Sequence, residues 1–123
     1  MLGYVTIGVS DMAKAQEFYG ALFAEVGAKE LFGFDRIKFY GTSKSEAMVA
    51  ICIPYDEQQA SCGNGGMFAI PAGGKDKVDA LYEKAISLGA KDEGEPGQRV
   101  PDFFYGAYVR DLDGNKICFY EMS

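Results

Sequence analysis

The chain repeats one helical motif, and this repeat limits the folds that are open to it. Apolar residues recur at three- and four-residue intervals in both copies, which is typical of a helix with one buried face. The two faces consist of Ala15, Phe18, Leu22 and Val26 in the first copy, and of Val78, Leu81, Ala85 and Leu88 in the second. Asp11 predicts the start of the first helix, and Gly27 and Gly89 predict the ends of both. An internal repeat predicts two structural modules with the same plan.

Strand-like segments surround the two helical segments in the same order. Tyr4 to Val9 precedes the first helix and Met67 to Ile70 precedes the second. Three strand candidates follow each helix: 31–34, 36–40 and 47–53 in the first half, and 98–100, 104–110 and 116–122 in the second. The sequence therefore predicts an α+β fold of two tandem βαβββ modules with mixed β-sheets. We expect a single domain over residues 1–123, with module 1 at about 1–56, a glycine-rich link at about 57–65 and module 2 at about 66–123.

Alternation within the strands separates a helix-packed face from a free face. Successive side chains of a strand point to opposite sides of the sheet, so apolar residues at every second position indicate the packed side. Val5 and Ile7 are such residues in the first strand, and Ile117 and Phe119 in the last. The residues between them are then free: Tyr4, Thr6 and Gly8, Ala50 and Cys52, Met67 and Ala69, and Lys116, Cys118 and Tyr120.

Charge and composition exclude several classes of partner. The chain has 12 Lys and Arg against 18 Asp and Glu, for a net charge of −6, which opposes binding to nucleic acid or to an anionic membrane. It has no long apolar run and no secretory signal pattern, so we expect a cytoplasmic protein. Its three cysteines, Cys52, Cys62 and Cys118, lack paired spacing, and we expect reduced thiols.

Two stretches resemble one known superfamily. The first is residues 4–11, Tyr-Val-Thr-Ile-Gly-Val-Ser-Asp, followed by Phe18-Tyr19. The second is residues 108–117, Tyr-Val-Arg-Asp-Leu-Asp-Gly-Asn-Lys-Ile. Both are similar to the vicinal oxygen chelate superfamily of glyoxalases, bleomycin-resistance proteins and ring-cleaving dioxygenases. The resemblance spans nearly the whole chain. It implies curled sheets whose free faces form a cup-shaped site for a small organic molecule, commonly completed in a homodimer. Leu112 stands where the family usually has proline.

The resemblance also shows where metal ligands would stand, and this chain has none of the expected residues there. Metal-using members place histidine or glutamate at four positions that correspond here to Tyr4, approximately Cys52, Met67 and Cys118. The chain contains no histidine at all, although imidazole is the commonest ligand for transition metals. We therefore expect no metal and no cofactor. The alternative is a soft metal such as Cu(I), bound by the sulfur atoms of cysteine and methionine. Cysteine and methionine also suit an apolar cup without a metal.

Aromatic residues and one arginine supply the other candidate ligand-binding residues. Tyrosine joins an apolar ring to a hydrogen-bonding hydroxyl, which suits a planar, partly polar ligand. The full candidate set is Tyr4, Cys52, Met67, Arg99, Tyr105, Tyr108, Cys118 and Tyr120, with Phe39 and Phe104 given less weight. Arg99 either clamps a ligand carboxylate or is a solvated residue paired with Asp102.

Two functional hypotheses follow from these residues, beside a third in which the chain is a structural or regulatory module whose cup is filled by core side chains. The first is a metal-independent, dimeric protein that binds an aromatic or amphipathic molecule. The alternative is a diverged lyase, isomerase or thiol-dependent enzyme that uses Cys118 or tyrosine hydroxyls, which requires a cation such as Lys116 to stabilise a thiolate. Catalysis by a carboxylate pair lacks support, because Asp92, Glu93 and Glu95 are expected in a solvated loop.

Overall fold

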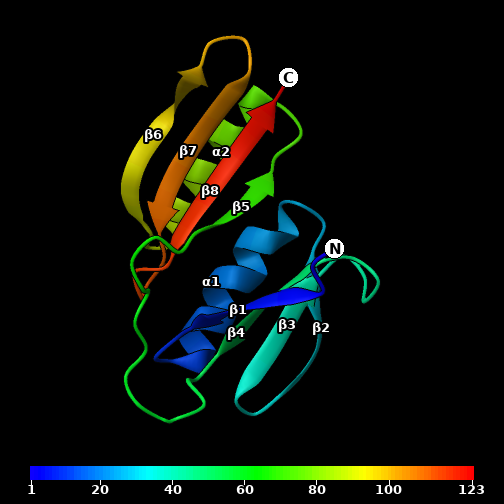
Figure 1. The fold of residues 1–123 in the computed structure, drawn as a ribbon, viewed down its shortest axis with the longest axis vertical. Helices are drawn as coiled ribbons and strands as arrows, with labels where there is room; N and C mark the ends of the chain where they lie inside the picture. The colour runs from blue at the N-terminus through cyan, green and yellow to red at the C-terminus, as the bar shows by residue number, and fades with distance from the viewer. The chain divides into compact units, whose positions relative to one another are not determined.

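The computed structural model describes all of residues 1–123, and the chain divides into two compact units. The first unit, Met1–Cys62, contains β1 (Tyr4–Gly8), α1 (Met12–Ala24), β2 (Lys29–Phe34), β3 (Ile37–Gly41) and β4 (Met48–Cys52). The second unit, Gly63–Ser123, contains β5 (Phe68–Pro71), α2 (Lys75–Ser87), β6 (Lys91–Val100), β7 (Phe104–Arg110) and β8 (Lys116–Met122). Both units have the order βαβββ, which confirms the predicted α+β fold of two tandem modules (Figure 1).

Each unit forms one mixed sheet with the same topology. The strand orders are β1-β4-β3-β2 and β5-β8-β7-β6. The first and last strands of each unit pair in parallel, β1 with β4 and β5 with β8, and the remaining pairs are antiparallel. Parallel pairing requires a crossover connection, and the helix of each unit lies in the segment that provides it.

The helices begin and end at the signals that the sequence contains. The Asp11 side chain accepts a hydrogen bond from the Lys14 backbone N–H at 3.1 Å and so caps α1. Gly27 and Gly89 adopt φ values of 75° and 103°, a left-handed conformation that favours glycine after a helix. The buried helix residues are Ala15, Phe18, Tyr19, Leu22 and Phe23 in α1, and Val78, Leu81 and Ala85 in α2. Neither helix has the length and hydrophobicity that a membrane crossing requires.

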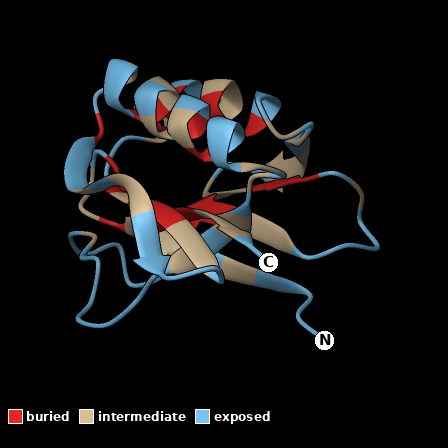
Figure 2. Ribbon diagram, turned by 90° about the horizontal axis from the view of Figure 1, so that it is seen from above, coloured by how far each residue is buried: buried red, intermediate tan, exposed pale blue.

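The core of each unit combines these helix residues with the packed faces of the strands. Ile51 in the first sheet, and Val109, Ile117 and Phe119 in the second, are fully buried. Figure 2 shows the buried positions on the strands and helices and the exposed positions along the connecting loops. The apolar alternation in these strands thus predicted the packed side correctly.

The structure corrects the sequence analysis at residues 91–100, where the acidic loop expected around Asp92 to Glu95 is part of a strand. This strand, β6, runs from Lys91 to Val100 at the edge of the second sheet, and its pairing with β7 is interrupted by three register shifts. Pro96 and three acidic residues obscured the strand pattern, but an edge strand tolerates proline and bulges because one of its sides needs no partner. Its carboxylates alternate in direction: Asp92 accepts a hydrogen bond from Tyr82 of α2, and Glu93 forms an ion pair with Arg110.

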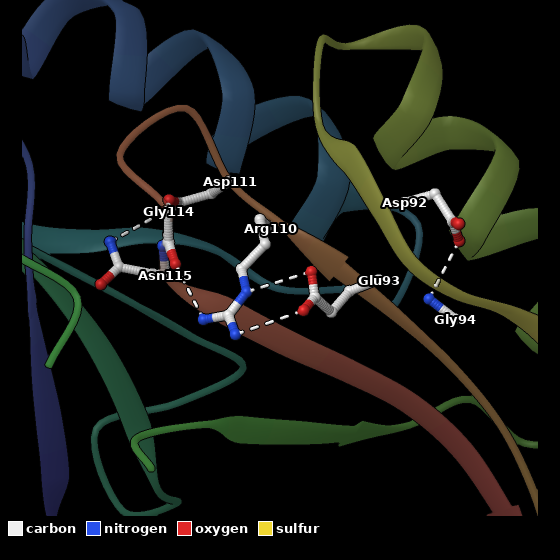
Figure 3. Close-up of polar contacts among 7 residues, drawn as sticks. All are labelled: Asp92, Glu93, Gly94, Arg110, Asp111, Gly114 and Asn115. Carbon is white, nitrogen blue, oxygen red and sulfur yellow. Dashed lines mark hydrogen bonds and ion pairs between the residues drawn. The ribbon is translucent and has the colours of Figure 1, made fainter. Parts of the chain in front are cut away.

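The turn between β7 and β8 is organised by Asp111, which is 5% exposed. Its Oδ1 accepts hydrogen bonds from the backbone N–H groups of Asp113 (2.9 Å) and Asn115 (2.8 Å), and its Oδ2 accepts one from Asn115 Nδ2 at 3.0 Å. Arg110 borders this turn, donating to the Gly114 carbonyl at 3.1 Å and contacting Glu93 at 3.4 Å (Figure 3). The turn sets how β8 returns along β7, and therefore which residues of the two strands lie opposite each other.

Replacing Asp111 by alanine tests this role. The variant loses three hydrogen bonds and leaves the buried Asn115 amide without this acceptor, so we expect a loss of about 2–4 kcal/mol in the free energy of unfolding. The measurement is urea denaturation followed by circular dichroism. Asp35→Ala, at an exposed position, is the matched control and should change stability by less than about 0.5 kcal/mol. Equal effects of the two substitutions would contradict the account of the turn.

Candidate functional site

The residues that carry chemistry in the second unit lie on the sheet face opposite α2. Strand register aligns Gly94 of β6, Tyr108 of β7, Cys118 of β8 and Ala69 of β5 in one row across the sheet. Their strand neighbours Val109 and Ile117 are fully buried, which identifies the other face as the packed one. We call the face that carries this row the open face of the second sheet.

Tyr108 lies at the centre of the row and has two cations beside its ring. The Arg99 guanidinium carbon is 5.4 Å from the ring centroid, and the Lys116 ammonium nitrogen is 5.2 Å from it. Both distances lie within the range of cation–π attraction. Gly94 makes room for this arrangement, because a Cβ atom there would lie 2.9 Å from the Tyr108 ring and 3.3 Å from a nitrogen of Arg99.

Cys118 lies beneath this cluster and is 1% exposed. Burial raises the pKa of the Cys118 thiol above its ordinary value, and a hydrogen bond from the Tyr108 hydroxyl, with the charges of Arg99 and Lys116, offsets the shift only in part. The pKa of Tyr108 is also raised, mainly by burial and then by the neighbouring Cys118 sulfur. At neutral pH the pair is therefore a neutral phenol and a neutral thiol.

A pair of stacked aromatic rings continues the open face beside Tyr108. The rings of Phe104 and Tyr120 have centroids 5.5 Å apart and an interplanar angle of 8°. The Phe104 ring lies over Gly106, where a Cβ atom would come within 2.7 Å of it. The open face of the second sheet thus combines aromatic rings with two cations, the Tyr108 hydroxyl and the Cys118 thiol.

The open face of the first sheet is aromatic as well. Phe39 stacks on Phe32 with ring centroids 4.4 Å apart and meets the edge of Tyr4 at 4.9 Å. The Lys44 ammonium lies 5.2 Å from the centroid of the Phe32 ring. Tyr4 is half exposed, whereas Phe39 is buried.

Of the four positions that the resemblance matches to metal ligands, the two in the first unit lie apart. Tyr4 pairs with Met48 in the β1–β4 register, whereas Cys52 pairs with Gly8 at the other end of the strands. Met67 precedes β5 and is half exposed, and Cys118 lies opposite Ala69. No set of three or more Cys, Asp or Glu side chains in the chain is arranged to hold a metal ion.

The structure brings together some predicted site residues and separates others. Arg99, Tyr108, Cys118 and Tyr120 share the open face of the second sheet. Tyr105 does not join them: it lies on the face toward α2, where its hydroxyl donates a hydrogen bond to Asp79 at 2.7 Å. This placement corrects the expectation that Tyr105 and Tyr108 lie together, since two residues three positions apart in a strand point to opposite sides.

Phe104 and Phe39, to which the sequence analysis gave less weight, lie on the open faces, together with Phe32 and Gly94, which it did not consider. The strand alternation contained the signal for the first two, because Phe104 stands four residues before Tyr108 and Phe39 aligns with Ala50 in the next strand. The contribution of Gly94 appears only when β6 and β7 are paired, and it depends on the register shifts of β6.

The burial of the thiols predicts a specific pattern of chemical modification. Cys62 is exposed, while Cys52 and Cys118 are buried. With Ellman's reagent at pH 8 we expect the folded protein to react rapidly at Cys62 and slowly at the other two, because attack requires an accessible thiolate. Cys62→Ser should remove the rapid phase, and all three thiols should react in denaturant. Rapid modification of Cys118 in the folded Cys62→Ser variant would contradict the buried, neutral thiol.

Comparison with known proteins agrees with this architecture. The family model of the glyoxalase/bleomycin resistance protein/dioxygenase superfamily matches residues 1–119. A glyoxalase/bleomycin resistance protein from Albidiferax ferrireducens T118 is 32% identical, over 100% of this chain and 99% of that chain, with a TM-score of 0.89. Two further structures share the fold. Hypothetical protein SA1046 from S. aureus is 24% identical, over 98% of this chain and 92% of that chain, with a TM-score of 0.76. Lactoylglutathione lyase from Agrobacterium tumefaciens is 21% identical, over 98% of this chain and 92% of that chain, with a TM-score of 0.72. No curated protein matches. The chain belongs to the glyoxalase/bleomycin resistance protein/dioxygenase superfamily.

Proposed function

We propose that this superfamily member binds a small aromatic or amphipathic organic molecule without a metal, as a homodimer in the cytoplasm. The observation that carries the proposal is the open face of the second sheet, where Tyr108, the Phe104–Tyr120 stack and Cys118 lie on the side opposite α2. Aromatic rings on a face without a covering helix are suited to bury a planar ligand.

The chemistry of the side chains supports organic ligands. Tyr108 and Tyr120 each join a ring to one hydroxyl, and Ala69 beside Cys118 leaves space in the row. A ligand ring packed here would gain apolar burial at roughly 25 cal/mol per Å² while its polar group meets a hydroxyl or a cation. The aromatic cluster of Tyr4, Phe32 and Phe39 on the first sheet has the same character.

The donor set argues for binding without a metal. The chain has no histidine, and the four positions that the resemblance matches to metal ligands hold tyrosine, cysteine and methionine; two of these, Tyr4 and Cys52, lie at opposite ends of the β1–β4 pair. A soft-metal site would need its thiolates and thioethers within one coordination sphere, as tetrahedral sulfur sites have. No three Cys, Asp or Glu side chains of the chain form such a group.

The properties of Cys118 also weigh against a thiol-dependent enzyme. A nucleophilic cysteine needs a lowered pKa and access to its substrate. The Cys118 thiol is buried, and burial raises its pKa despite two nearby cations. We therefore favour a structural role for Cys118 in the floor of the binding face.

Metal analysis together with thermal denaturation tests the proposed function. We expect far less than one zinc, nickel or iron per chain by inductively coupled plasma mass spectrometry, and a rise in melting temperature with 2-naphthol, since a ligand that binds the native state stabilises it. Native mass spectrometry of the same sample should give the mass of a dimer. Stoichiometric metal, or a melting temperature that no aromatic probe raises, would refute the proposal.

Two tyrosine variants locate the binding face. Tyr108→Ala should weaken 2-naphthol binding about tenfold, because the ligand loses its aromatic contact on the open face. Tyr82→Ala removes a tyrosine from α2, whose hydroxyl contacts Asp92, and should leave the affinity unchanged. Isothermal titration calorimetry measures both. Equal losses in the two variants would place binding elsewhere.

A further inference from the structure

The open face of the second sheet has two cations that converge on one ring. Arg99 comes from the edge strand β6 and Lys116 from the start of β8, and both lie within 6 Å of the Tyr108 ring centroid, at 5.4 and 5.2 Å. The chain as a whole has a net charge of −6, so this positive cluster is opposite in sign to the rest of the molecule. Two like charges held near one another repel, and an anion that lies between or beside them offsets this repulsion.

The protein does not provide that anion. The ion pair in the chain joins Arg110 to Glu93, and neither Arg99 nor Lys116 has a carboxylate within ion-pair distance. Arg99 donates a hydrogen bond to the backbone carbonyl of Glu95, and it is not paired with Asp102, the alternative that its sequence position suggested. The thiol of Cys118 stays neutral, because its burial raises the pKa.

The guanidinium of Arg99 is already held in place before any ligand arrives. Gly97 lies beside it, at a position where a Cβ atom would come within 2.7 Å of the Arg99 Nη1. A Cβ atom at Gly94 would lie 3.3 Å from the Arg99 Nη2, and the Glu95 carbonyl accepts a hydrogen bond from this nitrogen. The remaining N–H donors of the fork stay available, and a side chain ordered in advance reduces the entropic cost of binding.

We propose that this face selects an aromatic carboxylate, whose anionic oxygens bind Arg99 and Lys116 beside Tyr108 and whose ring packs on the stack of Phe104 and Tyr120. The proposal rests on the proposed ligand-binding function and adds the charge and the chemical class of the ligand. A carboxylate matches the planar donor fork of arginine, and the adjoining aromatic surface accounts for the apolar part of the molecule.

Selectivity follows from the difference between a carboxylate and an uncharged group of the same shape. Hydrogen bonds to ionised partners are about twice as strong as neutral ones, but the exposed position of Arg99 weakens them by solvent screening. We therefore expect a preference of about tenfold for the anion, which corresponds to the lower range measured for charged hydrogen bonds.

A matched pair of ligands tests the proposal. The dissociation constants of 2-naphthoate and 2-naphthamide, which share a ring system and differ in charge, are measured with the full chain by two-dimensional ¹H–¹⁵N NMR titration. The wild type should bind 2-naphthoate about tenfold more tightly, with shifts in the Arg99 Nε–H signal. In the Arg99→Gln/Lys116→Gln double variant the two constants should become equal, mainly through loss of naphthoate affinity. The Lys14→Gln/Lys77→Gln double variant, an equal loss of two positive charges at exposed positions on α1 and α2, should keep the preference.

The outcomes separate this proposal from the one on which it rests. Equal affinities for both ligands in the wild type, or a preference that survives in the double variant, would overturn the anion site and leave the binding function intact. Failure of both naphthalene ligands and of 2-naphthol to bind would overturn both proposals. Circular dichroism spectra and melting temperatures of the variants show that each has folded.

Discussion

The packing of one helix against one face of each sheet is the constraint on which the rest of this structure depends. Because α1 and α2 each cover a single face, every second side chain of the strands points toward a helix and the intervening ones point to the opposite face. In the second sheet, Val109 and Ile117 are fully buried on the side that faces α2. Tyr108 and Cys118, their strand neighbours, are consequently directed to the open face. The same alternation of side chains along the strands thus produces the helix-packed face and the face that carries the candidate site.

Charge gives the open face of the second sheet its chemical character. Two of the three acidic residues of β6 are engaged elsewhere, Asp92 with Tyr82 on α2 and Glu93 with Arg110. Arg99 and Lys116 lie beside Tyr108 and form no ion pair with a carboxylate. Because this face lacks histidine and carries cations and aromatic rings, we propose that it binds the anionic group of an organic molecule rather than a metal ion.

Much of this arrangement could be predicted from the sequence, because it depends on local periodicity. The helical repeat indicated two modules, and alternation placed Cys118 and Tyr120 on the free face. Tyr105 was grouped with Tyr108 although a spacing of three residues in a strand reverses the side, so that error was avoidable.

Other features depend on pairing between strands and could not be predicted. The start of β6 at Lys91 was hidden by proline, glycine and acidic residues that only an edge strand tolerates. The distance between Tyr4 and Cys52 follows from the parallel register of β1 and β4, which no local pattern specifies. The approach of Arg99 and Lys116 to Tyr108 requires that β6, β7 and β8 align. It also requires a residue without a Cβ atom at position 94, where glycine stands.

A crystal structure of the protein with 2-naphthoate, recorded with X-rays that give anomalous scattering from transition metals, tests the central claim most directly. The account predicts density for the carboxylate at Arg99 and Lys116, the naphthalene ring against Phe104 and Tyr120, and no anomalous peak at Tyr4, Cys52, Met67 or Cys118. An anomalous peak bound to those residues, or a ligand ring on the helix side of the second sheet, would contradict it.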